Sequence, residues 1–136
     1  PNGLKQVLTF LRSNMKSGQK LIAVFGCAGL RDPGKRQPMG QIASEIADLS
    51  VFTAEDPRTE DIWSIIRQMK EGVQNFDRIH TVPDRESAIG YAIQTLASKG
   101  DVVAIFGKGH EHSMSYGQTE YAWNDIRAVE RIIQHE

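Results

Sequence analysis

The chain has 136 residues, a formal net charge of −1, 40% hydrophobic residues and 24% charged residues. These values indicate one globular domain with its own core, and they argue against a basic nucleic-acid surface. A single cysteine excludes a disulfide framework and fits a reducing compartment. No apolar run has the length of a membrane span and no signal peptide is recognisable, so we expect a cytoplasmic protein.

Hydrophobic periodicity predicts strands alternating with helices. In chain order we expect helix 2–15, strand 21–25, helix 39–47, strand 49–53, helix 59–72, strand 79–82, helix 85–99, strand 102–106, an irregular segment or small hairpin over 113–123, and helix 124–134. Thr59 is the expected N-cap of the third helix, with Glu60 and Asp61 in its first turn. This alternation requires right-handed crossovers, so it predicts the α/β class: a Rossmann-like, mainly parallel sheet with helices on both faces.

The segment around which the chain is organised is the strand 102–106 and the turn that follows it. The strand is apolar throughout, which is typical of a strand buried on both faces, and it stops at Gly107. In open α/β sheets, ligands bind beyond the carboxyl ends of the strands. Glycines in the turn let the backbone approach a ligand, and Lys108, His110 and Glu111 add two possible cations and one anion. The turn is therefore a candidate site.

A long polar loop follows the strand 21–25. Gly29 to Lys35 has the spacing of a phosphate-binding P-loop, but Arg36 stands where Ser or Thr must reach magnesium, and Pro33 removes a backbone donor. The glycine spacing of a dinucleotide-binding fingerprint is also missing. Arg31, Lys35 and Arg36 together indicate either an anion site or a solvated basic loop, with nothing in the loop to decide between them.

Taken alone, the other polar clusters are best explained by structural rather than functional roles. Asp56-Pro57-Arg58 follows strand 49–53, and its arginine could bind a carboxylate. Taken alone, however, this cluster is better interpreted as an ordinary loop. Asp84-Arg85-Glu86 is expected to be a helix N-cap and first turn. His110 and His112 lack a third ligand, so no metal site is predicted. Cys27 is expected to be a structural thiol, and the tryptophans and tyrosines to be packing residues.

Taken together, segments 24–40, 56–58 and 107–111 resemble the carboxy-terminal domain of the Mur ligases, in order and at similar spacing over nearly the whole chain. The resemblance implies an ATP-dependent amide ligase of the bacterial cytoplasm. ATP phosphorylates the carboxylate of UDP-MurNAc-L-Ala-D-Glu, and the amine of an incoming amino acid attacks the acyl phosphate. ATP and Mg²⁺ are bound mainly by a central domain that this sequence lacks. Residues 1–136 would then be one domain of a three-domain ligase, inactive alone and partnered by the other two domains.

Site residues follow from the resemblance by position. Arg31 and Arg58 would hold a carboxylate of the amino acid, and Asp56 would lie beside its distal end. The backbone of Gly107 and the carboxylate of Glu111 would meet its polar groups, with an ammonium as the natural partner of Glu111. Lys35 is a weaker candidate that would face the phosphates on domain closure. No catalytic residue is expected in this chain itself.

The substrate and the branch of the family stay open at this point. Members that add meso-diaminopimelate usually read Asp-Asn-Pro-Arg, whereas this chain reads Glu55-Asp56-Pro57-Arg58. Asp56 would repel a distal carboxylate and favour a distal ammonium, while Arg58 suits diaminopimelate, so the sequence favours L-lysine slightly over meso-diaminopimelate. The alternatives are a domain of folylpolyglutamate synthase or cyanophycin synthetase, or a non-catalytic amino-acid- or nucleotide-binding module.

Overall fold

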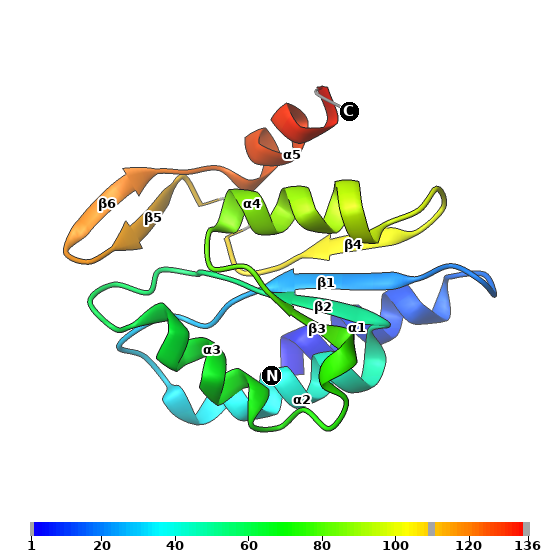
Figure 1. Ribbon diagram of the computed structural model, residues 1–136, viewed down its shortest axis with the longest axis horizontal. Coiled ribbons are helices and arrows are strands. Elements are labelled where there is room, and N and C mark those ends of the chain that lie inside the picture. The colour runs from blue at the N-terminus through cyan, green and yellow to red at the C-terminus, as the bar shows by residue number, and fades with distance from the viewer. Residues whose placement is uncertain (1, 109–110, 135–136) are drawn as a thin grey trace.

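The computed structural model describes residues 2–108 and 111–134, so the predictions for Gly109 and His110 lie outside the described residues. The chain forms a three-layer α/β domain with a small hairpin at one end (Figure 1). Its main elements are α1 (Asn2–Ser13), β1 (Leu21–Phe25), α2 (Arg36–Ile46), β2 (Leu49–Phe52), α3 (Ile62–Lys70), β3 (Ile79–Thr81), α4 (Arg85–Gly90), β4 (Val102–Ile105), β5 (Ser113–Tyr116), β6 (Thr119–Ala122) and α5 (Asp125–Gln134). Within this part of the chain, no helix is long and apolar enough to cross a membrane.

The central sheet is parallel throughout, with the strand order β3-β2-β1-β4. In the register, Val24 of β1 lies between Val51 of β2 and Ile105 of β4. The predicted parallel sheet is therefore confirmed. The hairpin β5-β6 is a separate antiparallel pair that packs beyond the carboxyl ends of the strands (Figure 1).

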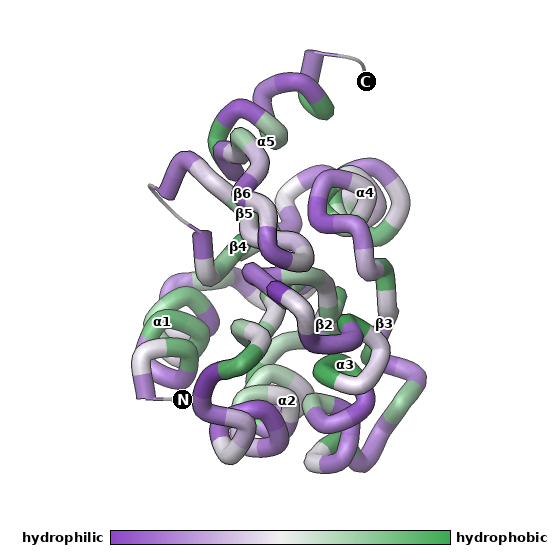
Figure 2. The backbone as a smooth tube through the Cα atoms, turned by 90° about the vertical axis from the view of Figure 1, so that its left-hand side faces the viewer, coloured by the Kyte–Doolittle hydropathy of each residue, from purple (hydrophilic) through white to green (hydrophobic). Residues whose placement is uncertain are grey.

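Two hydrophobic cores lie on opposite faces of the sheet, because successive side chains of β1 point to opposite sides. Leu21, Ala23 and Phe25 pack against α1, α2 and α3. Ile22 and Val24 pack against α4 and α5. All five side chains of β1 are fully buried, as expected for the strand at the centre of a doubly covered sheet. Figure 2 shows hydrophilic residues in many of the loops and hydrophilic and hydrophobic residues mixed along the helices.

The predicted elements all form, with differences at their ends. The long helix predicted at 85–99 stops at Leu96, with α-helical turns in α4 and π-helical turns over Tyr91–Leu96. Segment 113–123 forms the small hairpin rather than an irregular loop. The prediction for Thr59 was wrong: α3 begins at Ile62, and the Asp61 side chain caps it by accepting from the Trp63 backbone N–H at 3.3 Å. Residues 59–61 are held instead by the contacts of Glu60 described below.

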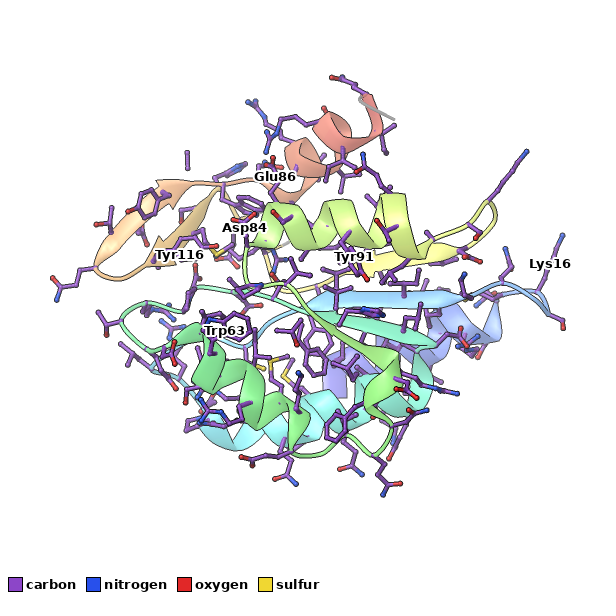
Figure 3. The ribbon with its side chains drawn as sticks, viewed as in Figure 1. Lys16, Trp63, Asp84, Glu86, Tyr91 and Tyr116 are labelled. Carbon is purple, nitrogen blue, oxygen red and sulfur yellow. The ribbon has the colours of Figure 1, made fainter. Side chains whose placement is uncertain are left out.

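The strand order places a topological switch point at the carboxyl ends of β1 and β4, because β2 lies on one side of β1 and β4 on the other. The loops after β1, β2 and β4 leave the sheet at this end (Figure 1), and the loop after β2 contacts the β5-β6 hairpin through a bridge between Arg58 and Tyr116. Trp63, Asp84 and Tyr116 also lie at this end of the molecule (Figure 3). The chain segments singled out in the sequence therefore converge in space.

Candidate functional site

The loop after β2 has an unusual backbone that is fixed by the hairpin. Asp56 and Arg58 both have a positive backbone φ, at 43° and 56°, which is uncommon for residues other than glycine and asparagine. The Arg58 backbone N–H donates to the Ser115 carbonyl at 3.0 Å, and the Gly117 N–H donates to the Arg58 carbonyl at 2.6 Å. These contacts hold a strained loop in one shape, as is common at binding sites.

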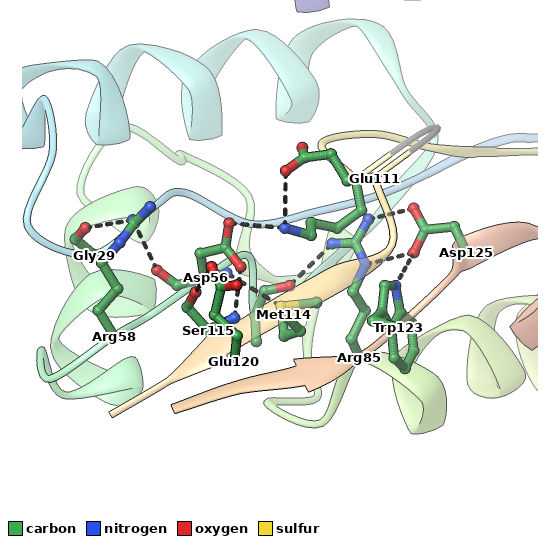
Figure 4. A network of polar contacts seen from close by, with 12 residues as sticks. Gly29, Asp56, Arg58, Arg85, Glu111, Met114, Ser115, Glu120, Trp123 and Asp125 are labelled. Atoms are coloured by element: carbon green, nitrogen blue, oxygen red, sulfur yellow. Dashed lines mark hydrogen bonds and ion pairs between the residues drawn. The ribbon is translucent and has the colours of Figure 1, made fainter. Parts of the chain in front are cut away.

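A cluster of charged side chains joins this loop to the turn after β4. The Nζ of Lys108 lies 2.7 Å from Oδ2 of Asp56 and 3.2 Å from Oε1 of Glu111. The other Asp56 oxygen, Oδ1, accepts from the Ser115 backbone N–H at 2.7 Å (Figure 4). We name Asp56, Lys108 and Glu111 the acid–lysine cluster. Its lysine side chain is 1% exposed, whereas that of Glu111 is 59% exposed and faces the surroundings.

The cluster changes the acidity of its members. Burial acts to raise the pKa of Asp56, but the hydrogen bonds from Lys108 and from the Ser115 N–H outweigh burial and lower the pKa below its ordinary value. Asp56 is therefore held as a carboxylate. Neighbouring Glu55 behaves in the opposite way: burial raises its pKa, although Arg85 and Lys108 act against the shift. The pKa of one carboxyl is thus lowered while that of its neighbour in the chain is raised.

Gly107 is at a position that only glycine fits. Its φ is +112°, and a Cβ added there would lie 1.8 Å from Oε1 of Glu55. The backbone of the turn after β4 therefore runs directly against the Glu55 side chain. Close approach of the Gly107 backbone to a ligand stays a prediction, since the group that it meets in the structure is the chain's own Glu55 carboxyl, which borders the acid–lysine cluster.

Arg58 is pinned at the rim of the site. Its Nη1 donates to the Gly29 carbonyl at 2.9 Å and to the Asp56 carbonyl at 3.3 Å (Figure 4). Two hollows flank it: one of about 410 Å³ beside Tyr116 and Asp84, and one of about 370 Å³ beside Ser115. Both have the size of small-molecule sites. A guanidinium fork fixed at such an edge is suited to a carboxylate.

The loop after β1 is only partly drawn into the site. Gly29 lies against the loop after β2: its N–H donates to the Asp56 carbonyl at 2.9 Å, and a Cβ on Gly29 would lie 1.8 Å from the Pro57 oxygen. Arg31 and Lys35 are exposed, and Lys35 pairs with Asp32 at 3.3 Å. Among the described residues, neither of these two cations contacts the acid–lysine cluster.

Arg36 belongs neither to a solvated basic loop nor to an open anion site, the two possibilities that the sequence left open. Its side chain is 1% exposed and lies against Glu60, with Nη1–Oε2 at 2.5 Å and Nη2–Oε1 at 2.8 Å. Nη2 also donates to the Ala28 carbonyl at 3.0 Å. This arginine therefore ties the loop after β1 to the segment before α3. Its pairing with a residue 24 positions away was not visible in the sequence.

Arg85 is the structural residue that the sequence reading missed. It is fully buried, and it donates to the carbonyl of Ala54 at the end of β2 and to that of Phe106 at the end of β4, both at 2.9 Å. Asp125 at the start of α5 receives two further hydrogen bonds at 2.8 Å each. One guanidinium thus sets the spacing of the two strand ends that carry Asp56 and Lys108. Because Arg85 directly follows the N-cap Asp84, the sequence predicted only an ordinary first-turn residue at this position.

Cys27 is a buried thiol whose acidity is weakened by its surroundings. Burial, reinforced by Glu55, raises the pKa of the Cys27 thiol to about 12, in agreement with the predicted structural role. Its Sγ lies 3.7 Å from the Met39 sulfur. Within residues 2–108 and 111–134, no three His, Cys, Asp or Glu side chains are grouped to hold a metal ion.

The chain is similar in sequence to a protein family and to several known proteins. The family described as "Mur ligase, glutamate ligase domain" matches residues 1–109. The UDP-N-acetylmuramoyl-L-alanyl-D-glutamate–2,6-diaminopimelate ligase of Chromobacterium violaceum is 41% identical over 133 residues, which are 98% of this chain and 27% of the relative. The ligase of the same name from Geobacillus kaustophilus is 44% identical over 137 residues, covering 100% of this chain and 27% of its own length.

A solved structure is similar over the whole domain. A structure of a UDP-N-acetylmuramoyl-L-alanyl-D-glutamate–2,6-diaminopimelate ligase superposes with a TM-score of 0.90 at 38% sequence identity, covering 100% of this chain and 28% of the solved chain. This chain therefore spans about 27% of the length of the curated relatives that it matches. With the family match over residues 1–109 and the common fold, the chain belongs to the Mur ligase family, as a glutamate ligase domain.

Proposed function

We propose that this chain is the amino-acid-binding domain of an ATP-dependent ligase that joins meso-diaminopimelate to UDP-N-acetylmuramoyl-L-alanyl-D-glutamate. The observation that carries the proposal is the convergence of Arg58 with the acid–lysine cluster at the switch point of the sheet. Relatives about 40% identical over this whole domain are named for that reaction. The longer protein would supply the other domains.

The charges of the site suit a zwitterionic amino acid. Arg58 would receive a carboxylate, and the exposed carboxylate of Glu111 would receive an ammonium. The backbone of Gly107 would line the same edge, where it runs directly against the Glu55 side chain. Arg31 lies on the loop whose Gly29 contacts Arg58, and it would join the site as a second carboxylate ligand when a substrate is present. In this role the domain holds the attacking amine in position, and such positioning can supply a large part of the rate acceleration of the ligation reaction.

The pairing of Asp56 changes the expectation about substrate. The preference for L-lysine treated Asp56 as an unopposed negative charge at the distal end of the amino acid. In the structure its carboxylate is shared between Lys108 and the Ser115 N–H. A distal carboxylate therefore does not meet a bare anion, and Arg58 is near to receive it. This removes the physical basis for preferring lysine, and the names of the relatives favour meso-diaminopimelate.

ATP and Mg²⁺ would be bound mainly outside this chain. The loop from Gly29 to Lys35 does not fit a nucleotide–magnesium site, because the position that needs a Ser or Thr hydroxyl is Arg36, whose guanidinium is buried against Glu60. Lys35 is exposed and pairs with Asp32 on its own loop, and it would be available to face phosphates on domain closure. The isolated chain is accordingly expected to show no ATP turnover.

Ligand-observed NMR on this chain tests the proposal directly. Titration with meso-diaminopimelate, L-lysine, L-ornithine and D-glutamate should show selective binding of meso-diaminopimelate. Glu111→Ala should weaken that binding by about tenfold or more, as expected for the loss of a charged hydrogen-bond partner. Glu130→Ala is the matched control, since Glu130 is an exposed glutamate on α5.

The longer protein provides the second arm of the test. Ligation of radiolabelled meso-diaminopimelate to the UDP-linked dipeptide should require both ATP and an intact Arg58. An enzyme that ligates L-lysine in preference to meso-diaminopimelate would overturn the substrate assignment. An enzyme that accepts neither diamino acid would overturn the proposed function.

A further inference from the structure

Lys108 is buried in an unusual way for a lysine. Its side chain is 1% exposed, and its ammonium is held between Asp56 at 2.7 Å and Glu111 at 3.2 Å. Lysines are rarely buried unless they are paired, so the two acids are what allow this burial. These contacts hold the ammonium in one place, unlike the ammonium of a mobile surface lysine.

The acid–lysine cluster has a simple charge balance. Two carboxylates and one ammonium give a net charge of −1, with Asp56 held ionised by its hydrogen bonds. Without Lys108 the same place would carry −2. Without the negative charge of Asp56 it would carry 0. Glu55 borders the cluster and is common to all three cases.

We propose that Lys108 determines which diamino acid the site accepts, by neutralising Asp56 so that an amino acid with a distal carboxylate can bind. This inference rests on the proposed function and deepens it. Meso-diaminopimelate has a carboxylate and an ammonium at its distal end, whereas L-lysine has only the ammonium. A more negative cluster repels the distal carboxylate of meso-diaminopimelate and attracts the distal ammonium of L-lysine. Lys108 keeps the net charge of the cluster at −1, at which the distal carboxylate is tolerated.

The contacts make Asp56 and Lys108 one unit for this purpose. Asp56 Oδ1 is anchored by the Ser115 N–H and Oδ2 by Lys108, so its carboxylate cannot turn away from the site. Removal of the lysine leaves this anchored anion uncompensated within the acid–lysine cluster. Removal of both charges leaves a neutral pair of similar size. The two variants therefore separate a charge effect from a loss of shape.

The experiment uses the full-length ligase that contains this chain. The ratio of kcat/KM for meso-diaminopimelate to that for L-lysine is measured for wild type, Lys108→Met, Asp56→Asn and the double variant. These carry cluster charges of −1, −2, 0 and −1. The ratio should fall about tenfold in Lys108→Met, rise in Asp56→Asn, and return close to the wild-type ratio in the double variant. Lys99→Met, which removes an exposed lysine near the opposite end of β4, should leave the ratio unchanged.

Each outcome decides the matter. A purely structural role for Lys108 would lower kcat/KM equally for both amino acids and leave the ratio unchanged, which would overturn the inference while leaving the proposed function intact. If circular dichroism shows that Lys108→Met alone is poorly folded, the other two variants still test the inference. The ratio should then be higher in Asp56→Asn than in the double variant, and equal ratios in these two variants would overturn the inference. A wild-type enzyme that does not ligate meso-diaminopimelate would overturn the proposed function, and this inference with it.

Discussion

Arg85 and Asp125 lie 40 residues apart in the chain and form a buried two-point ion pair, with Nε–Oδ1 and Nη2–Oδ2 both at 2.8 Å. The indole N–H of Trp123 donates to the same Oδ1 at 2.7 Å. Through Ala54 and Phe106, this pair joins two strand ends of the sheet to the start of α5. It is therefore the contact that shapes the base of the candidate site.

Asp125→Ala should lower the free energy of unfolding by about 3–5 kcal/mol, because it leaves the Arg85 guanidinium buried without its ionic partner. Urea unfolding followed by circular dichroism measures the loss. Glu86→Ala is the matched control: its partner Arg131 is 52% exposed, and an exposed pair contributes less than about 1 kcal/mol. Similar losses in the two variants would contradict the role given to the buried pair.

The pair of Arg36 and Glu60 should make stability depend on pH in the acid range. The hydrogen bond from Arg36, followed by that from the Leu30 N–H, lowers the pKa of Glu60 from 4.5 to about 2. A lowered folded-state pKa means that the stabilisation is present above pH 4.5 and is lost as the pH falls towards 2. Its full size is no more than about 3 kcal/mol.

Glu60→Gln should therefore be less stable than wild type at pH 7, by about 1–3 kcal/mol, and the difference should shrink towards pH 2. Chemical denaturation at pH 7, 4 and 3 measures the profile. Glu130→Gln, which removes an exposed carboxyl, serves as the control for a general effect of charge. A difference between Glu60→Gln and wild type that stays constant from pH 7 to pH 3 would show that this ion pair is not the source.

Gly40→Ala should destabilise the domain by about 1–3 kcal/mol. A Cβ at Gly40 of α2 would lie 1.8 Å from the Met69 carbonyl oxygen of α3, so the two helices would have to move apart. Thermal unfolding should show a lower Tm for this variant. Gly34→Ala is the comparison, because a Cβ there has nothing within 4 Å. An equally small effect of both substitutions would mean that the helix contact is loose.

Cys27 should resist alkylation in the folded protein. Its thiol is 7% exposed and its pKa is raised to about 12 by burial, so very little thiolate forms near pH 8. Iodoacetamide labelling at pH 8, followed by mass spectrometry, should be at least about tenfold slower in buffer than in 6 M guanidinium, where the thiol approaches an ordinary pKa. Rapid labelling without denaturant would indicate that the loop after β1 opens readily.

The element pattern was predictable because it depends on local periodicity. The apolar runs of the strands and the helical spacing of Ile62, Ile65, Ile66 and Met69 each lie within a few residues of the chain, and the resulting order of strands and helices allows few topologies. The ends of elements were less predictable. Thr59 has the chemistry of a cap, but the distant partner Arg36 holds Glu60, and the helix starts at Ile62 after Asp61.

In the candidate site too, some features were predictable from the sequence and others were not. Gly107 and Glu111 were marked by the local pattern, because glycine and polar residues after a buried strand lie at the ligand-binding edge of a parallel sheet. Asp56 and Arg58 were marked only by the resemblance to the Mur ligases, since their local pattern alone favoured an ordinary loop. Whether Arg31 and Lys35 join the bound amino acid stays a prediction, since in the structure they lie on an exposed part of their loop.

Only the tertiary structure decided how the charges pair. Lys108 could have been a surface cation, Arg36 part of an anion site and Arg85 an ordinary first-turn residue. Each is buried on a carboxylate 24 to 52 positions away in the chain. Ion pairing depends on distance in space and on desolvation, and neither is encoded in local spacing. The sequence therefore determined which residues reach the site, and the fold decided that Asp56 arrives there already neutralised.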